Sequence, residues 1–310
     1  MMTGEAQGVP QHAGRLRSVA LRCAGLSKRF GKVQALNGLD LQLEPGSSVG
    51  LVGRNGAGKS TLFRCIVGAE QPDAGHVQTE PPLKRVPFLA NLGFVPDSLS
   101  AYDWMTVGRA VDYVAAMQPH FDAAWNQDLM RLLALDRSAR IRSLSRGMQA
   151  RLAFVLGLSH RPALVLLDEP LLGVDAVSHD AVLEVLARMR AVQGCTMLIA
   201  SHQLADLARL TDRVAFMDGG RVVEEVDTDH LVECTKRIMV RPAPGPAWVA
   251  PEGTVLRRVV DGAMLLTLRD FQPAHMQVLQ AGLPGAQIEV LDLSINEACA
   301  DRLRAMEVQA

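Results

Sequence analysis

The sequence has few lysines and no excess of charge of either sign. Only five of the 32 basic residues in the 310-residue chain are lysine, and 33 acidic residues bring the formal net charge to −1. This balance excludes the strong basic field of a dedicated nucleic-acid-binding protein. We therefore expect no nucleic-acid partner.

Paired cysteines and long apolar runs are also missing. The cysteines show no CxxC pair and no metal-ligand spacing, and no secretory signal opens the sequence. No run approaches the roughly 18 to 20 apolar residues that span a bilayer. We interpret the chain as a soluble, cytoplasmic protein with reduced thiols, whose role at a membrane would need a separate partner. The five cysteines are Cys23, Cys65, Cys195, Cys234 and Cys299.

Nearly half of the residues are apolar, enough for one large domain and a small one. Residues 1–17 are polar and predict a flexible tail. Residues 18–234 alternate between strand and helix patterns, and continuous apolar runs such as ALVLLDEP are typical of parallel strands covered on both faces. A proline-rich change of composition precedes two strand-like runs and a final helix. The sequence therefore predicts an α/β domain followed by a small α+β accessory domain over 235–310.

Two local patterns refine this outline. Between about 98 and 150 the apolar spacing becomes helical and predicts an insert, in which Thr106 can cap the first helix. The segment RVAFMDGGRVVEE predicts a hairpin that turns at Gly219 and Gly220. A second helix of the insert is expected to carry Leu129, Leu132, Leu133 and Leu135.

A phosphate-binding loop follows the apolar strand SSVGLVG. GRNGAGKS matches GxxxxGK[ST], in which Lys59 reaches the β- and γ-phosphates and the Ser60 hydroxyl binds Mg²⁺. Glycines let several backbone N–H groups face one point, and the helix that follows adds positive potential. The alternative is a glycine-rich turn with an incidental lysine. The predicted nucleotide-binding residues are Gly53, Arg54, Asn55, Gly56, Ala57, Gly58, Lys59, Ser60 and Thr61.

Two carboxylates end the apolar run LVLLDEP. Asp168 can hold the magnesium shell, and Glu169 can face an attacking water. A buried acidic pair is costly unless a cation or a reaction needs it, so the pattern favours a nucleotide-hydrolysing site. The alternative is a strand that ends in an exposed acidic turn.

Between these motifs lies LSRGMQARL, residues 144–152, which resembles the signature motif of ATP-binding cassette (ABC) proteins. In that family the serine and glycine, here Ser145 and Gly147, cap the γ-phosphate bound by the opposite subunit. The resemblance covers residues 18 to about 230. It implies a P-loop NTPase fold with a RecA-like mixed sheet, an antiparallel β subdomain and the helical insert. The alternative for LSRGM alone is an ordinary helix cap.

Three further residues match family positions. Phe30 matches the aromatic residue that stacks on adenine, Asp175 lies in the loop that touches the other subunit's site, and His202 matches the γ-phosphate sensor. Their alternatives are a core phenylalanine, a simple turn and a structural histidine.

The sequence departs from the family at Asp97, where glutamine usually contacts magnesium and relays nucleotide state to the membrane partner. An aspartate can still ligate the ion or its water, or it can be an exposed turn residue. Arg146 and Met148 also replace the glycine and glutamine of many signatures. Together these departures resemble the branch that serves exporters.

The resemblance implies an ATPase with ATP and Mg²⁺ as cofactors, working as a homodimer or heterodimer at the inner face of the cell membrane through a separate permease. Glu169, His202 and Lys59 would act in catalysis, and Ser60, Asp168 and Asp97 at the metal. One alternative is a soluble cassette ATPase acting on the ribosome or DNA. Another is a P-loop kinase or nucleotide-dependent regulator. Residues 235–310 carry no motif, and dimer contact, regulation or plain packing all stay open.

Overall fold

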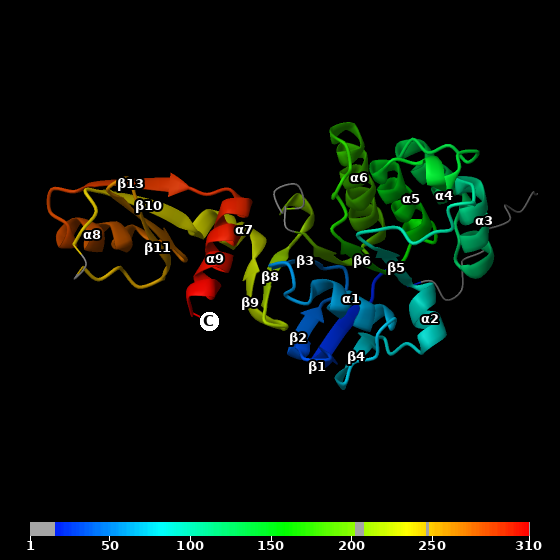
Figure 1. Cartoon of the computed structure of the whole chain (residues 1–310), viewed down its shortest axis with the longest axis horizontal. Helices are drawn as coiled ribbons and strands as arrows, with labels where there is room; N and C mark the ends of the chain where they lie inside the picture. Colours follow the sequence, from blue (N-terminus) through cyan, green and yellow to red (C-terminus); the bar gives the residue numbers. More distant parts are fainter. Residues whose placement is uncertain (1–15, 202–207, 246–247, 310) are drawn as a thin grey trace, which may run out of the picture.

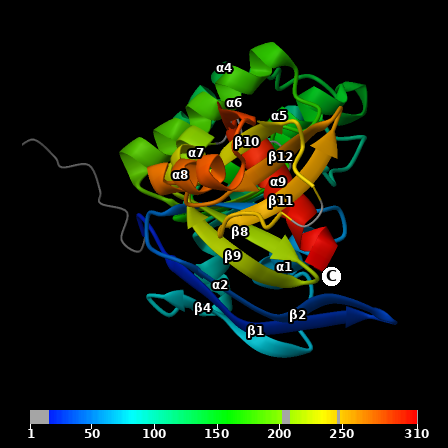
Figure 2. The ribbon, with the colours of Figure 1, turned by 90° about the vertical axis from the view of Figure 1, so that its left-hand side faces the viewer.

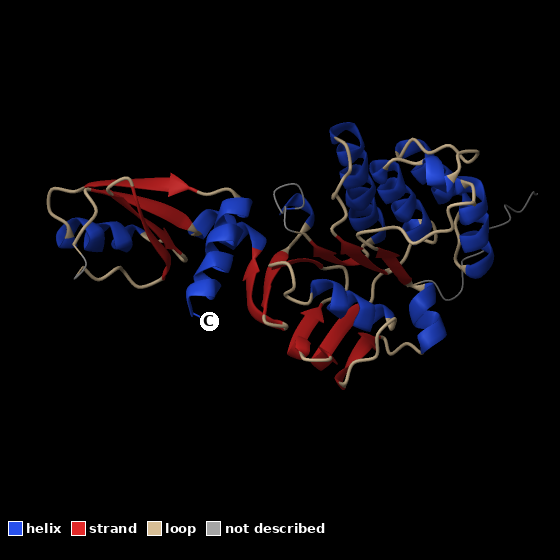
Figure 3. Cartoon of the chain, viewed as in Figure 1, coloured by secondary structure: helices blue, strands red, loops and turns tan. Residues whose placement is uncertain are grey.

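The computed structural model describes residues 16–201, 208–245 and 248–309. Its elements form three sheets with helices between and beside them (Figure 3). The predicted tail over 1–17 lies almost entirely outside the described residues. Within the described part, no helix is both long and apolar enough to cross a membrane.

The central sheet has the strand order β5-β6-β7-β3-β8-β9. The first five strands run parallel, and β9 pairs with β8 in the antiparallel direction. Every residue of β3, β6 and β7 is buried, as expected for strands covered on both faces. This is the mixed sheet of the P-loop NTPase fold that the resemblance implied. The strands are β5 (Leu92–Val95), β6 (Leu164–Asp168), β7 (Thr196–Ala200), β3 (Ser48–Gly53), β8 (Arg213–Asp218) and β9 (Arg221–Asp227).

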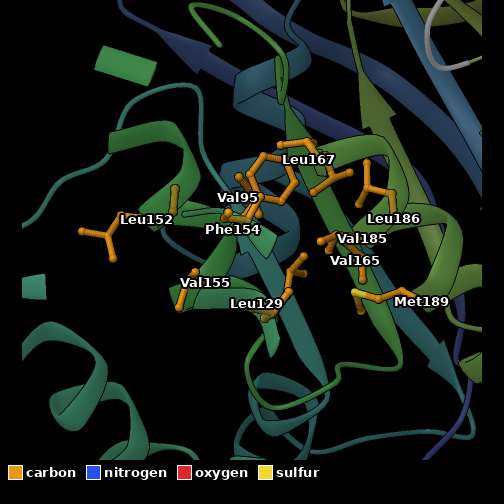
Figure 4. Packing of buried hydrophobic residues seen from close by; sticks show 14 of the residues in the cluster. Val95, Leu129, Leu152, Phe154, Val155, Val165, Leu167, Val185, Leu186 and Met189 are labelled. Atoms are coloured by element: carbon orange, nitrogen blue, oxygen red, sulfur yellow. The ribbon is translucent and has the colours of Figure 1, made fainter. Parts of the chain in front are cut away.

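Alternate residues of β6 face opposite sides of this sheet. Val165 and Leu167 pack against α5 (Arg146–Leu158) and α6 (Ala176–Arg188), which continues into a π-helical turn (Met189–Gln193). Figure 4 shows Phe154 and Val185 of these helices closing on β6. Leu164 and Leu166 pack on the other side with α1 (Lys59–Val67). The sheet therefore holds the phosphate-loop helix on one face and the signature helix on the other.

An antiparallel sheet with the order β2-β1-β4 forms the next layer (Figure 2). Leu39, Leu41 and Leu43 of β2 are all buried, which confirms the shared face that their alternation predicted. The sheet leads into α2 (Arg85–Ala90) and back to β5. Its strands are β1 (Ala20–Phe30), β2 (Val33–Leu43) and β4 (Ala74–Glu80).

The insert contains α3 (Val107–Met117), α4 (Ala123–Leu132) and a 3-10 turn (Ile141–Ser143) before α5. Thr106 caps α3 as predicted, because its hydroxyl accepts a 3.2 Å hydrogen bond from the Arg109 backbone N–H. The expected second helix is shorter than its apolar pattern suggested. It ends at Leu132, since Ala134 has a φ of +46° and cannot continue an α-helix. Leu133 and Leu135 are still buried. Their apolar spacing therefore indicated burial correctly, although these residues lie beyond the end of the helix.

The hairpin β8–β9 turns at Gly219 and Gly220, with φ of +51° and +77°, as the sequence predicted. A 3-10 turn (Ala208–Leu210) precedes it, and α7 (Thr228–Cys234) follows.

Beyond α7, the sequence predicted two strands and a final helix, whereas the described residues of this part form four strands and two helices. All strands of this C-terminal sheet are antiparallel, in the order β11-β12-β10-β13. The prediction missed the strand before the proline-rich segment, one of the three strands after it, and the helix that begins at Pro273. Its elements are β10 (Lys236–Arg241), β11 (Thr254–Val260), β12 (Ala263–Leu268), α8 (Pro273–Gly282), β13 (Gln287–Asp292) and α9 (Ile295–Gln309).

The C-terminal sheet has a core of its own with α8, built around Ile238, Leu266 and Leu279. In contrast, α9 joins a cluster with Val214 and Phe216 of β8. Figure 1 shows α9 standing between the C-terminal sheet and the β8–β9 hairpin. The two parts of the chain therefore meet along α9.

Candidate functional site

The phosphate loop joins β3, which ends at Gly53, to α1, which begins at Lys59. Gly58 has a φ of +107°, and a Cβ there would lie 2.3 Å from the Ala35 carbonyl oxygen. A Cβ on Gly53 would lie 2.5 Å from the Met217 carbonyl oxygen. Side chains cannot fit at either position without moving backbone, so the loop needs both glycines.

Lys59 folds back over this loop. Its ammonium donates hydrogen bonds to the carbonyl oxygens of Gly53 at 2.6 Å and Arg54 at 3.1 Å. Burial lowers the pKa of Lys59, and the nearby charges of Glu169 and Asp168 oppose that change. A cationic donor is thus held over backbone that a phosphate would approach, which fits the predicted contact with the β- and γ-phosphates.

The loop opens onto a cleft of about 980 Å³. Asp97, Asp168 and Glu169 line the same cleft, and so does Phe30 from the end of β1. Residues from four distant sequence segments therefore meet around one space, as the motifs predicted. The predicted loop residues that line it are Gly53, Arg54, Asn55, Gly56, Gly58, Lys59, Ser60 and Thr61, whereas Ala57 is buried beneath them.

Phe30 is 43% exposed, so the alternative interpretation as a core phenylalanine is wrong. The Lys28 ammonium lies 5.4 Å from the centroid of its ring. An exposed ring at the mouth of the cleft is available to stack on a base.

Asp168 and Glu169 follow β6 directly, and their backbones differ. Asp168 is the last strand residue and is 4% exposed. Glu169 has a φ of +49°, in the left-handed region, while its N–H donates to the Ala200 carbonyl oxygen at 2.8 Å. A non-glycine residue held in this region stores strain, which is common at functional sites.

Burial raises the pKa of Asp168. A hydrogen bond with Ser60 opposes this rise, while the charges of Asp97 and Glu169 reinforce it. Such a cluster of carboxylates attracts a cation, because a positive charge would relieve the repulsion between them.

The donor set fits magnesium. No group of three or more histidine, cysteine, aspartate or glutamate side chains suited to a metal occurs within the described ranges. Mg²⁺ does not need one, because it usually keeps several waters and takes one or two carboxylates together with phosphate oxygens. Ser60 and Asp168 would hold the ion together with the phosphates. Asp97 lies close enough for its charge to raise the pKa of Asp168. The bound ion would neutralise negative charge on the phosphates.

The signature residues lie apart from this cleft. The Ser145 hydroxyl accepts a 3.2 Å hydrogen bond from the Met148 N–H and so caps α5. A Cβ on Gly147 would lie 3.0 Å from the Gly173 carbonyl oxygen and 3.7 Å from the Asp175 carboxylate. Gly147 is buried, whereas Ser145 and Asp175 are exposed. The two motifs therefore lie side by side, and their exposed residues share one surface.

Asp175 caps α6 at this surface, accepting hydrogen bonds from the Ser178 N–H at 3.0 Å and the Ser178 hydroxyl at 2.8 Å. These bonds hold the pKa of Asp175 below its ordinary value. Neither Asp175 nor the two signature residues line the nucleotide cleft of their own chain. His202 lies outside the described residues.

Sequence reasoning missed several apolar residues of the cleft wall, namely Val33, Ala35, Leu172 and Leu303. Val33 and Ala35 lie close to Phe30 in the β1–β2 hairpin, so the adenine-stacking prediction could have led to them. Leu303 lies on α9, and nothing in the local sequence connects it to the phosphate loop.

Comparison with known proteins places this site in a family. Residues 36–172 match the family model described as ABC transporter. The ABC transporter ATP-binding protein YtrB of Bacillus subtilis is 33% identical over 215 residues, which cover 67% of this chain and 72% of the relative. The methionine import ATP-binding protein MetN of Mesorhizobium japonicum is 30% identical, with 92% and 87% covered.

Solved structures agree on the fold. The ATP-binding subunit of an ABC transporter superposes with a TM-score of 0.62 at 24% identity, covering 68% of this chain and 91% of the other. A dimeric ATP-binding cassette in a post-hydrolysis state, bound to ADP and phosphate, gives a TM-score of 0.60 at 20% identity, covering 67% and 98%. Together with the sequence relatives, the phosphate loop and the acidic pair, this shows that the chain belongs to the ABC transporter family as an ATP-binding subunit that hydrolyses ATP with Mg²⁺.

Proposed function

We propose that two cassettes close head to tail and that their ATP hydrolysis drives transport through a separate membrane protein, at the cytoplasmic face of the membrane. The separation of the two surfaces carries this proposal. Lys59 and Glu169 line the cleft, whereas Ser145 and Gly147 lie outside it. Signature residues that meet phosphate must then come from a second chain, either a copy or a sister subunit.

The residues of the cleft divide the chemistry between them. The Glu169 carboxylate would orient an attacking water and accept its proton, while the Lys59 ammonium would stabilise negative charge on the transferred phosphoryl group. Ser145 and Gly147 of the second chain would add a helix N-terminus to the γ-phosphate. A site built from two chains acts only when they close, so hydrolysis follows association.

The proposal of a membrane partner is supported by a groove beside the insert. It encloses about 430 Å³ between β5, α3 and α5, and Tyr113 and Met117 on its rim are 61% and 68% exposed. Pro96 and Leu99 also line the groove. Both flank Asp97, which lines the nucleotide cleft. A helix of the membrane protein seated here would contact the same turn that senses the nucleotide, and so would couple closure to transport.

The direction of transport is not part of this proposal. Asp97 and the LSRGM signature predicted export by resemblance. However, two of the similar relatives, MetN and the aliphatic sulfonates protein SsuB of Pseudomonas putida, are named import ATP-binding proteins, so they do not support that direction.

Glu169→Gln tests the catalytic part. Removing the base should slow ATP hydrolysis by about 10² to 10⁴ fold while ATP still binds. ATP should then hold the variant as a dimer in size-exclusion chromatography. Glu184→Gln is the matched control, because Glu184 is an exposed residue of α6 that pairs with Arg188. Unchanged turnover in Glu169→Gln would refute the catalytic assignment.

Met117→Arg tests the partner. A charged side chain in the apolar groove should release the chain from the membrane fraction of its native host, with ATP binding retained. The control is Arg131→Ala, at an exposed position of α4 outside the groove. Equal recovery of both variants with membranes would contradict a permease docked in this groove.

A further inference from the structure

The C-terminal helix contributes a residue to the nucleotide cleft. Leu303, in the middle of α9, lines the same space as Lys59 and Phe30. We infer that Leu303 is a nucleotide-binding residue, through which the C-terminal sheet sets the affinity of the cassette for adenine nucleotides. This rests on the assignment of the cleft to ATP made above.

Three consecutive residues of α9 face three different parts of the molecule, since neighbouring residues on a helix do not share a face. Asp301 faces the C-terminal sheet. Its fully buried carboxylate accepts 2.6 Å hydrogen bonds from the Arg237 guanidinium of β10 and the Thr267 hydroxyl of β12. These hydrogen bonds of Asp301 fix α9 to the C-terminal sheet.

Arg302 faces the cassette. It is 3% exposed, forms an ion pair with Glu224 of β9 and places its guanidinium 5.8 Å from the ring centroid of Phe216 in β8. A buried arginine paired in this way holds its helix in one position, because leaving either charge unpaired is costly. The helix is therefore fixed on both sides.

Leu303 faces the cleft from this fixed helix. It also packs against the cluster that contains Val52, the residue immediately before Gly53 of the phosphate loop. A shift of α9 would thus reach the cleft wall and the strand that carries the loop. The position of Leu303 therefore depends on the contacts of α9 with the C-terminal sheet and with the central sheet.

The chemistry of the wall indicates which part of the nucleotide Leu303 meets. The phosphate end of the cleft is formed by backbone, Lys59 and carboxylates. An aliphatic side chain gains by burying apolar surface and gives nothing to a phosphate. Leu303 is therefore suited to contact the base or the ribose. Its loss should weaken the binding of ATP and of ADP equally.

The experiment compares Leu303→Ala with Met306→Ala in the full chain. Met306 lies one helical turn later and packs on the same cluster, but it does not line the cleft. We expect isothermal titration calorimetry to give a Kd about tenfold higher for both MgATP and MgADP in Leu303→Ala. In Met306→Ala both Kd values should stay within about twofold, whereas the two variants should lose similar thermal stability.

Leu303→Met, which keeps the volume, should restore the affinity. Leu303→Gln replaces Leu303→Ala if the alanine variant does not fold, and it should also raise both Kd values. Unchanged affinity in the folded variants, or equal loss in the Leu303 and Met306 variants, would overturn the inference. The MgADP titration involves no hydrolysis, so its outcome is separate from the Glu169→Gln test of turnover.

Discussion

The Lys59 ammonium donates a 2.6 Å hydrogen bond to the carbonyl oxygen of Gly53, six residues earlier and at the start of the same loop. The lysine thus closes the loop across its own backbone. Its burial lowers its pKa, and negative charge brought near it would oppose that change by attracting the ammonium.

We expect Lys59→Ala to raise the Kd for MgATP by about 10- to 100-fold, the range of a hydrogen bond to a charged group. Titration calorimetry on the purified chain measures this. Lys84→Ala is the control, because Lys84 is exposed and lies outside the cleft. Equal affinities of the two variants would contradict a phosphate contact by Lys59.

Gly58→Ala should abolish ATP binding and lower the free energy of unfolding, because its Cβ would meet the Ala35 carbonyl oxygen. The strain of its positive φ adds about 1 to 3 kcal/mol. Gly56→Ala separates the two causes. Gly56 has a φ of +85° but no protein atom within 4 Å of a Cβ, so that variant should lose stability through strain alone and by less than Gly58→Ala. Denaturant unfolding and nucleotide binding on both proteins check this.

Ser145→Ala and Thr106→Ala remove two equivalent helix caps. Each hydroxyl accepts a 3.2 Å hydrogen bond from the backbone three residues later, so each change should cost about 1 kcal/mol of stability. Only Ser145→Ala should also reduce ATP hydrolysis at concentrations where the cassettes pair. If both variants kept wild-type turnover, Ser145 would be a cap and nothing more.

Asp301 should make stability depend on pH. Burial alone would raise the pKa of Asp301, but the hydrogen bonds from Thr267 and Arg237 outweigh it, and the pKa lies below its ordinary value. A depressed carboxyl pKa stabilises the folded state above the unfolded pKa, and this contribution is lost as the pH falls through the folded value.

We therefore expect Asp301→Asn to lower the free energy of unfolding at pH 7 by about 3 kcal/mol, as for a broken buried ion pair. The gap to wild type should hold down to about pH 5 and narrow below it. Urea unfolding at pH 7, 5 and 4 measures this. Asp292→Asn, which breaks the exposed pair with Lys236, should change stability little at any of these pH values. A gap that stays constant to pH 4 would contradict the depressed pKa.

Local sequence patterns predicted most of the elements and site residues of the cassette. GRNGAGKS predicted the turn and the residues that line the cleft, because glycine conformation and the adjacent helix start are set within a few residues. Thr106 and the Gly219–Gly220 turn were predicted for the same reason. The end of α4 at Leu132 was not, since burial of Leu133 and Leu135 depends on neighbours in space and continues the apolar pattern past the helix.

The sequence alone determined the identity of the chemical groups: a lysine in a glycine loop, two carboxylates after an apolar strand, and a serine and glycine that open a helix. Tertiary structure decided their grouping. It placed Ser145, Gly147 and Asp175 together and apart from the cleft, and it brought Leu303 from the C-terminal helix into the cleft wall. The physical reason is that motifs arise from short-range backbone constraints, whereas a cleft wall arises from packing between residues far apart in the chain.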